Sequence, residues 1–225
     1  KITRTPANIA EEMIIDSFGN GAVIAQYSGH GGRHVWAHEI MFSITDIESM
    51  KETNIYPFLM VFSCYNGYFD IPGELCMAEG MLRAKRRGVV AMFSATRLTY
   101  GTGNVALNKL LFDAIFKQKI LRIGQTTTVA KINLLIRDMH QLTQLQEYTL
   151  FGDPASRLNL PEFEIQPQVS NLTVSSSTKL EMQSGQVLDN ITGKPGHYNG
   201  NVTAEIHLPD KSSISKTISV LNGNY

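Results

Sequence analysis

Short apolar runs alternate with longer amphipathic stretches over the first 160 residues of the chain. The runs are apolar at successive positions, as in strands that helices cover on both faces of a sheet. In the stretches between them, apolar residues recur at helical spacing, which is typical of helices with one buried face. The pattern predicts an α/β domain with a mostly parallel sheet. We expect strands at residues 22–27, 57–63, 88–94 and 148–151, and helices at residues 6–18, 74–87, 104–117 and 125–140.

The composition changes near residue 160. After Pro154 and Pro161 the chain becomes rich in Ser, Thr, Asn and Gly, with short alternating runs at residues 171–174 and 201–208. Such runs between turn-forming residues are typical of antiparallel β-structure. We therefore expect a domain boundary at residues 160/161, followed by an immunoglobulin-like β-sandwich over residues 161–225. This second domain has no obvious last strand, and we interpret it as incomplete.

Composition and charge narrow the function classes. With 43% hydrophobic and 18% charged residues, the chain is typical of a globular protein. Twenty basic residues balance twenty acidic ones, so no overall field attracts nucleic acid or an anionic membrane. The longest apolar run is far shorter than the ~18 residues of a transmembrane helix. The start at Lys1, without Met or a signal segment, indicates processing or a chosen boundary.

Two predicted strands end in residues that can do chemistry. The first strand continues into Gly29-His30-Gly31-Gly32, and the second into Ser63-Cys64. In an open parallel sheet, functional groups gather beyond the carboxyl ends of the strands. A thiol needs a neighbouring base to become a good nucleophile at neutral pH. We therefore expect His30 and Cys64 to form a catalytic pair, with the backbone N–H groups of Gly31 and Cys64 as an oxyanion hole.

Other interpretations of these residues remain open. Taken alone, a cysteine at a strand end is usually a small buried hydrophobe, and a glycine-flanked histidine is usually part of a turn. A disulfide between Cys64 and Cys76 is a further alternative, although two cysteines are too few for a disulfide scaffold. His30, His34 and His38 have the spacing of one helical face, but the glycines oppose a helix there, so we expect no zinc site.

The carboxylates that follow the second strand have two interpretations. Asp70, Glu74 and Glu79 supply oxygen ligands that would suit a structural calcium ion. A solvated loop and an acid-stabilised helix start explain them as well. We expect no cofactor, and structural calcium is kept as the alternative.

The motifs around the two strand ends resemble the gingipain family of cysteine peptidases, within the caspase-like superfamily. The resemblance is carried by YSGHGGRHVWAHE at residues 27–39, FSCYNGYFD at 62–70, the run from Cys76 to Asn104, and LFGDPASRL at 150–158. It continues weakly into the run at residues 184–210, which is similar to the immunoglobulin-like module that follows such catalytic domains. The resemblance implies a caspase-like catalytic domain over residues 1–160, with His30 as base and Cys64 as nucleophile.

The resemblance also implies where substrate binds. The loop after the third strand, which holds Thr96, Arg97 and Tyr100, lies where the family builds one wall of its specificity pocket. Ser63 precedes the nucleophile, and we count it with this group. Trp36 either stacks near the same cleft or packs at the end of the sheet.

One expected part of the fold has no counterpart in the sequence. A full caspase-like sheet has strands before the one that carries the histidine, whereas only residues 1–20 precede the first predicted strand. The resemblance implies that a missing N-terminal segment supplies them, together with the carboxylate that orients His30. The chain is therefore interpreted either as part of a processed peptidase or as a truncated, inactive relative.

Three functions follow as hypotheses. The first is a secreted or cell-surface cysteine endopeptidase that acts on polypeptides, which the run Cys64-Tyr65-Asn66-Gly67 favours. The second is a sortase-like transpeptidase of type IX secretion that removes C-terminal sorting domains, to whose branch the run Ala95-Thr96-Arg97 is similar. The third is an inactive binding module. The resemblance places all three outside the cell or on a bacterial surface.

Overall fold

The computed structural model describes residues 7–161, 163–167, 185–189, 194, 196–207 and 213–224. The chain divides into two compact units between Asn159 and Leu160, and each is considered by itself. Among the helices of these described residues, none combines the length and apolar character needed to cross a bilayer.

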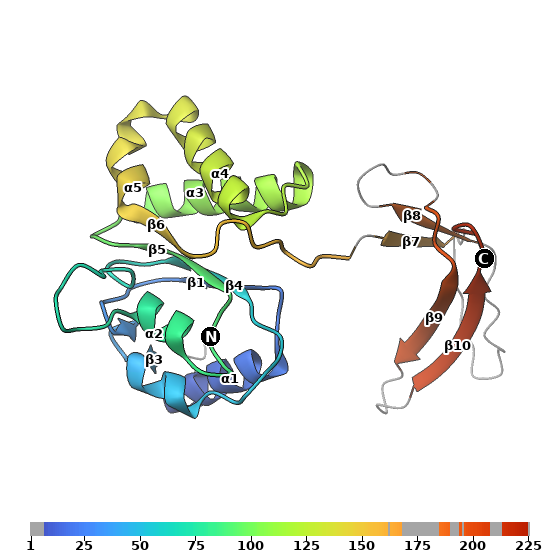
Figure 1. The fold of residues 1–225 in the computed structure, drawn as a ribbon, viewed down its shortest axis with the longest axis horizontal. Coiled ribbons are helices and arrows are strands. Elements are labelled where there is room, and N and C mark those ends of the chain that lie inside the picture. Colours follow the sequence, from blue (N-terminus) through green and yellow to red (C-terminus); the bar gives the residue numbers. More distant parts are fainter. Residues whose placement is uncertain are drawn as a thin grey trace, which may run out of the picture. The chain divides into compact units, whose positions relative to one another are not determined.

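The first unit is built on a four-stranded sheet in the order β1-β4-β5-β6 (Figure 1). Each strand forms within three residues of its predicted limits: β1 (Ile24–Ser28), β4 (Phe58–Phe62), β5 (Ala91–Ala95) and β6 (Tyr148–Gly152). The first three are parallel, but β6 runs antiparallel to β5, so the sheet is mixed. Two long helices lie between β5 and β6. The first crosses the sheet from the edge where β5 ends, and the second crosses back to that edge. The strand that follows must then run in the opposite direction.

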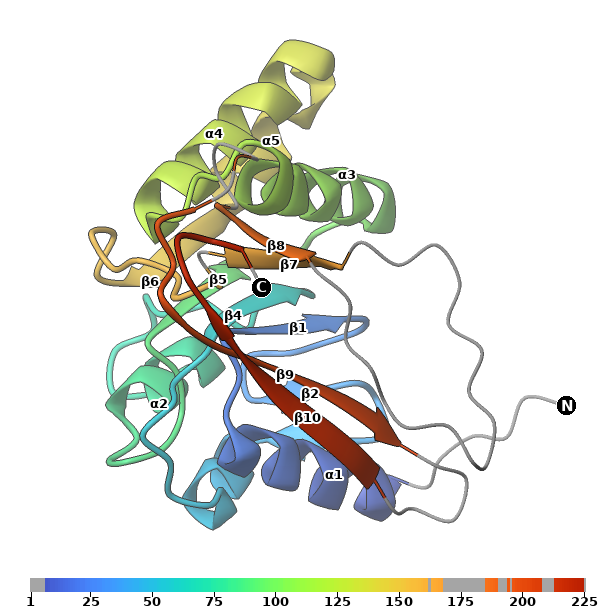
Figure 2. The same cartoon turned by 90° about the vertical axis from the view of Figure 1, so that its right-hand side faces the viewer.

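Helices cover both faces of this sheet (Figures 1 and 2). One face carries α1 (Ala7–Asn20) and α2 (Met77–Arg83). The other carries α3 (Gly101–Phe112), which a π-helical turn extends to Lys117, together with α4 (Ile123–Arg137) and α5 (Leu142–Glu147).

Two predicted helices differ from the structure. The helix expected over residues 74–87 is limited to α2, because Ala84 adopts an extended conformation and ends it. The helix expected over residues 125–140 ends at Asp138, which is also extended and accepts a hydrogen bond from the His140 N–H at 3.0 Å. A 3₁₀ turn (Met139–Gln141) and then α5 follow.

The sequence pattern also missed a short hairpin, β2 (Val35–Trp36) and β3 (Phe42–Ser43), which is followed by a 3₁₀ helix (Ile44–Ser49). Its turn contains Ala37 and Ile40 at positive φ, and neither residue type signals such a turn.

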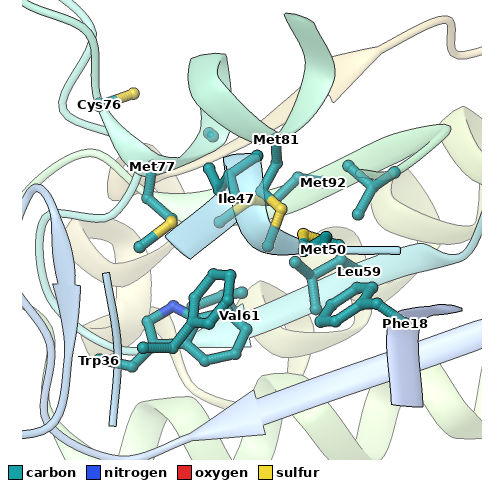
Figure 3. Close-up of a cluster of buried hydrophobic side chains, with 13 residues drawn as sticks. Phe18, Trp36, Ile47, Met50, Leu59, Val61, Cys76, Met77, Met81 and Met92 are labelled. Atoms are coloured by element: carbon teal, nitrogen blue, oxygen red, sulfur yellow. The ribbon is translucent and has the colours of Figure 1, made fainter. Parts of the chain in front are cut away.

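A methionine-rich core fills the space between the sheet and the α1/α2 layer (Figure 3). Alternate residues of β4 point to opposite faces, so Leu59 and Val61 enter this core while Phe58, Met60 and Phe62 face the other layer. Unbranched methionines adapt to irregular gaps between a helix and a twisted sheet. The methionines of the core are Met50, Met77, Met81 and Met92.

The described residues of the second unit form two antiparallel strand pairs. β7 (Phe163–Pro167) pairs with β8 (Gly185–Asp189), and β9 (Gly200–His207) pairs with β10 (Ser213–Val220). The strand predicted at 201–208 corresponds to β9, whereas the one predicted at 171–174 lies outside the described residues. Val187, Val202 and Val220 form a small core. The immunoglobulin-like topology stays a prediction.

Candidate active site

The loops that carry His30 and Cys64 begin side by side. Ser28 at the end of β1 pairs in register with Phe62 at the end of β4. The N–H of Gly29 then donates to the Phe62 carbonyl at 3.2 Å, one residue beyond the strand. His30 and Cys64 therefore leave the sheet at its carboxyl edge, each two residues past the paired strand ends.

A buried amide fastens the two loops together. Asn66 is fully buried; its Oδ1 accepts from the Ser63 hydroxyl, and its Nδ2 donates to the carbonyls of Gly32 and Val35. A Cβ at Gly31 would lie 2.6 Å from Ser63 Oγ and 3.0 Å from Asn66 Oδ1. Glycine at this position therefore permits the close contact between the loops.

Asn66 is a residue that the sequence analysis missed as part of the site. The signal that could have found it is an amide two residues after the candidate nucleophile, since buried side-chain amides must satisfy several hydrogen bonds at once.

The Cys64 thiol lies against the loop that follows β5. Its Sγ accepts from the Thr99 N–H at 3.5 Å and lies 3.6 Å from the Thr99 carbonyl oxygen. The next residue, Tyr65, has a φ of 63°, which turns the chain sharply after the cysteine, and its N–H donates to Arg97 O at 3.2 Å. Two neighbouring loops thus fix the partly buried nucleophile candidate.

The backbone of His30 is held while its ring is exposed. The His30 carbonyl accepts from the Tyr27 hydroxyl at 2.6 Å and from the Ala37 N–H at 2.8 Å. Its ring lies against that of His38, with centroids 4.9 Å apart. In the described chain, no hydrogen bond joins the His30 ring to the Cys64 thiol. Such contacts often tighten only when substrate is bound.

The two predicted oxyanion donors are available. Neither the Gly31 N–H nor the Cys64 N–H has a hydrogen-bond acceptor among the residues that the structure describes. Free backbone N–H groups beside a nucleophile are what a developing oxyanion requires.

Trp36 packs inside the molecule. It is 3% exposed, and its ring stacks on Tyr27 and contacts Phe42, with centroids 4.5 Å and 5.0 Å apart. This position corresponds to the packing interpretation of Trp36, and it leaves no face of the ring for a substrate.

The other predicted substrate-binding residues divide into two groups. Ser63 and Thr96 are buried; Ser63 is engaged as described, and the Thr96 hydroxyl donates to Glu147 O at 2.9 Å. Arg97 and Tyr100 are exposed, and the Tyr100 side chain is 67% accessible. Among the predicted substrate-binding residues, Arg97 and Tyr100 are therefore the two whose side chains can contact a peptide.

Paired charges flank the cysteine loop. Arg97 forms a bidentate ion pair with Asp70 at 2.7 and 3.1 Å, and Arg33 pairs with Glu74 at 3.1 Å. The Arg97 guanidinium lowers the pKa of Asp70, chiefly through the hydrogen bond. Both guanidinium groups face the Tyr68 ring, 4.4 Å from its centroid for Arg97 and 5.5 Å for Arg33. The local charges thus balance one another.

The residues considered for metal binding have partners of their own. The His34 Nε2 donates to the Leu75 carbonyl at 2.9 Å, away from the His30–His38 pair. Glu79 accepts the Cys76 N–H at 2.9 Å, and Asp70 and Glu74 are ion-paired as above. Within the described ranges, no three His, Cys, Asp or Glu side chains are grouped so as to hold a metal ion.

The two cysteines are free and differ in environment. Cys76 is fully buried at the start of α2, and burial raises the pKa of its thiol to about 11. Cys64 is partly exposed at the carboxyl edge. Cys76 therefore serves as an internal reference for the reactivity of Cys64.

Comparison with known proteins identifies the family of the chain. The family model described as "Peptidase family C25" matches residues 2–159. Gingipain R2 of Porphyromonas gingivalis strain W83 is 27% identical over 160 residues, or 65% of this chain and 21% of that protein. Gingipain R1 of Porphyromonas gingivalis is also 27% identical, with 16% of its length covered. The chain thus spans 9–21% of the length of the curated relatives that it matches.

Solved structures confirm the predicted fold class. The crystal structure of the Arg-specific cysteine proteinase gingipain R aligns with all of this chain and 49% of its own, at a TM-score of 0.61 and 23% identity. The complex of Porphyromonas gingivalis RgpB pro- and mature domains aligns with 95% of this chain and 49% of its own, at a TM-score of 0.58 and 22% identity. At these identities the likeness concerns the fold alone.

Proposed function

The chain belongs to peptidase family C25, and from that premise we propose that it is a cysteine peptidase in which Cys64 is the nucleophile and His30 the general base. One observation carries the proposal: Asn66 holds the two strand-end loops together at the carboxyl edge of the sheet. The free N–H groups of Gly31 and Cys64 add support.

The proposed reaction uses these groups in order. His30 accepts the thiol proton as the Cys64 sulfur bonds to the substrate carbonyl carbon, and the carbonyl electron pair moves to oxygen. The N–H groups of Gly31 and Cys64 donate to this oxyanion. The amine leaves with the proton held by His30, which gives a thioester. Water, deprotonated by His30, then hydrolyses the thioester and frees the thiol.

We also propose that the substrates are internal peptide bonds of polypeptides, contacted by Arg97 and Tyr100. The protein is proposed to act outside the cell or on a bacterial surface. A segment outside this chain would supply the carboxylate that orients His30. These points rest on the family resemblance together with the exposure of the two side chains.

The Cys64→Ala variant of the full-length protein tests the central assignment. We expect it to lose about 1,000-fold or more of peptide cleavage while its melting temperature stays unchanged, because the nucleophile is removed and its packing is slight. Cys76→Ala is the matched control, since it removes the other thiol and should retain turnover. Cleavage by Cys64→Ala at the wild-type rate would refute the proposal.

Transpeptidation shares the thioester and differs only in its acceptor. The run Ala95–Arg97, similar to the sortase-type branch, favours it as the second candidate. Assays with added amine acceptors should yield a conjugate if this candidate holds, and hydrolysis product alone if it does not. Peptide binding that survives Cys64→Ala, without any cleavage by the wild-type protein, would indicate a binding module.

A further inference from the structure

A chain of buried polar side chains leads from the Cys64 thiol into the α3/α5 layer. Thr99, whose N–H donates to Sγ, is 7% exposed, and its hydroxyl accepts from Asn104 Nδ2 at 3.2 Å. The Asn104 Oδ1 in turn accepts from Gln144 Nε2 at 2.5 Å and from the Tyr148 hydroxyl at 2.8 Å. Asn104, Gln144 and Tyr148 are 8%, 5% and 1% exposed.

The Tyr148 hydroxyl in this network is not needed for apolar packing. The Tyr148 ring already packs on Phe93 and Phe62, with centroids 5.2 Å and 5.9 Å apart, and a phenylalanine could make both contacts. Its hydroxyl adds a polar group that must be satisfied in the interior, and its acceptor is Asn104. Buried networks that are fully paired fix the geometry of the groups they hold.

The backbone at Gly103, next to Asn104, also restricts the space around this network. A Cβ at Gly103 would lie 2.7 Å from the Gln144 Cδ, so α3 and α5 approach closely at this point. The two donors to Asn104 Oδ1, from Gln144 and Tyr148, leave the Asn104 Nδ2 directed at Thr99. At one end of the network, Gln144 and Tyr148 belong to the layer of α3 and α5 and to β6, respectively. At the other end, Thr99 contacts the Cys64 thiol.

We propose that Asn104 and Tyr148 are positioning residues, which hold Thr99 so that its backbone N–H stays directed at the Cys64 sulfur. The inference deepens the proposed function and rests on Cys64 as nucleophile. The Thr99 N–H can donate to a thiolate, whereas the Thr99 carbonyl oxygen can accept only from the protonated thiol. Directing the N–H rather than the carbonyl at the sulfur is therefore how the network would favour the reactive form. The hydrogen bonds run from Tyr148 to Asn104, from Asn104 to Thr99 and from Thr99 to the sulfur, so both residues act on the thiol through Thr99.

Charged and titratable groups on the surrounding elements bear on any pH measurement. They are His30 after β1, Tyr65 and Asp70 after β4, Arg97 after β5 in its ion pair with Asp70, Lys131 on α4, which donates to the Tyr148 carbonyl at 2.7 Å, and Glu147 before β6. Burial raises the pKa of Tyr148 above the range of the assay, so its phenol stays neutral throughout. Replacing Tyr148 with Phe therefore changes one hydrogen bond and no charge.

The test is alkylation of Cys64 by iodoacetamide in the full chain carrying Tyr148→Phe, read by peptide mass spectrometry. We expect the rate at about pH 6.5 to fall about tenfold, because the loss of one buried hydrogen bond loosens Thr99. At about pH 9.5, where a free thiol is largely ionised, we expect the variant and wild type to agree within about twofold. Gln144→Leu removes the second donor to Asn104 and should act in the same direction.

Thr126→Val is the matched control. Thr126 is fully buried and donates to Ile120 O and Arg122 O, at the start of α4 near the opposite edge of the sheet. It should lower the melting temperature without moving the alkylation profile. If folded Tyr148→Phe and Gln144→Leu both match wild type at the lower pH, or if Thr126→Val shifts the profile equally, the positioning role is overturned.

The alkylation test of the positioning role can be separated from the cleavage test of the proposed function. Alkylation reports on the thiol whether or not peptide is cleaved. Loss of cleavage in Cys64→Ala together with unchanged alkylation in Tyr148→Phe rejects the positioning role alone. Retained cleavage in Cys64→Ala rejects the peptidase assignment while the alkylation comparison still decides whether Asn104 and Tyr148 act on the thiol.

Discussion

At the scale of single residues, the candidate site depends on groups that contact each other between loops. Gly31 shows this most directly, since a Cβ there would meet the side chains of Ser63 and Asn66 well within normal contact distance. Both neighbours are buried and hydrogen-bonded, so neither can move aside without breaking a contact.

Gly31→Ala should therefore separate the loops. We expect peptide cleavage to fall about 100-fold, because a displacement of about 1 Å between a base and a nucleophile has effects of that order. Gly101→Ala is the control, as nothing lies within 4 Å of the Cβ it would add. Equal activities of the two variants would show that the loop contact does not matter for catalysis.

Asn66→Asp keeps the shape of the side chain and removes its donor. The new carboxylate would face the carbonyls of Gly32 and Val35 in the interior, so burial raises its pKa in the folded state. Its folded pKa then lies above its unfolded pKa, and the variant loses stability as the pH rises from about 4 to 7. Urea unfolding at the two pH values measures this. A pH-independent difference from wild type would contradict the described contacts of Asn66.

At the scale of elements, the sequence pattern found the parts whose apolar periodicity is local. The four strands of the first unit and helices α1, α3 and α4 were predictable because burial on a sheet imposes that periodicity. The direction of β6 was not, since it depends on how often the chain crosses the sheet between β5 and β6. The break at Asp138 depends on one side-chain cap, and the β2–β3 hairpin on unusual φ values at Ala37 and Ile40.

The same limit applies to the site. Strand ends made His30, Gly31 and Cys64 visible as candidates, because parallel strands end at a common edge. Asn66 and Asn104 were missed because an amide reveals its role only through partners that are distant in sequence, such as Gly32 or Gln144. Trp36 could be assigned to packing only once its contact with Tyr27 was known.

The start of α2 joins both loops to the helical layer. The N–H groups of Met77 and Ala78 donate to Arg33 O and Asn66 O at 2.9 and 3.0 Å, and Glu79 accepts from the Cys76 N–H. Glu79→Ala should lower the free energy of unfolding by about 1 kcal/mol through the lost cap. Chemical denaturation measures it, with Glu12→Ala on α1 as a comparison. An unchanged free energy would show that Glu79 does not stabilise the start of α2.

At the scale of the whole molecule, each unit has a core of its own. Val202 belongs to the small core of the second unit and is 5% exposed. Val202→Ala should destabilise that unit by about 1–2 kcal/mol and leave Cys64 alkylation unchanged, because the site is built within residues 7–159. Leu59→Ala in the first core is the counterpart and should affect both readouts. A shift of the alkylation profile by Val202→Ala would show that the second unit contributes to the site.

The pairing of His30 with Cys64 is the central claim, and the pH dependence of thiol alkylation tests it most directly. Wild type and His30→Ala are compared in the full-length protein, with Cys76 as internal reference. The account predicts that wild-type Cys64 is alkylated about tenfold faster or more than Cys64 of His30→Ala at about pH 6.5, and that Cys76 stays unreactive in both. Equal alkylation rates of Cys64 in wild type and His30→Ala at that pH would contradict the account.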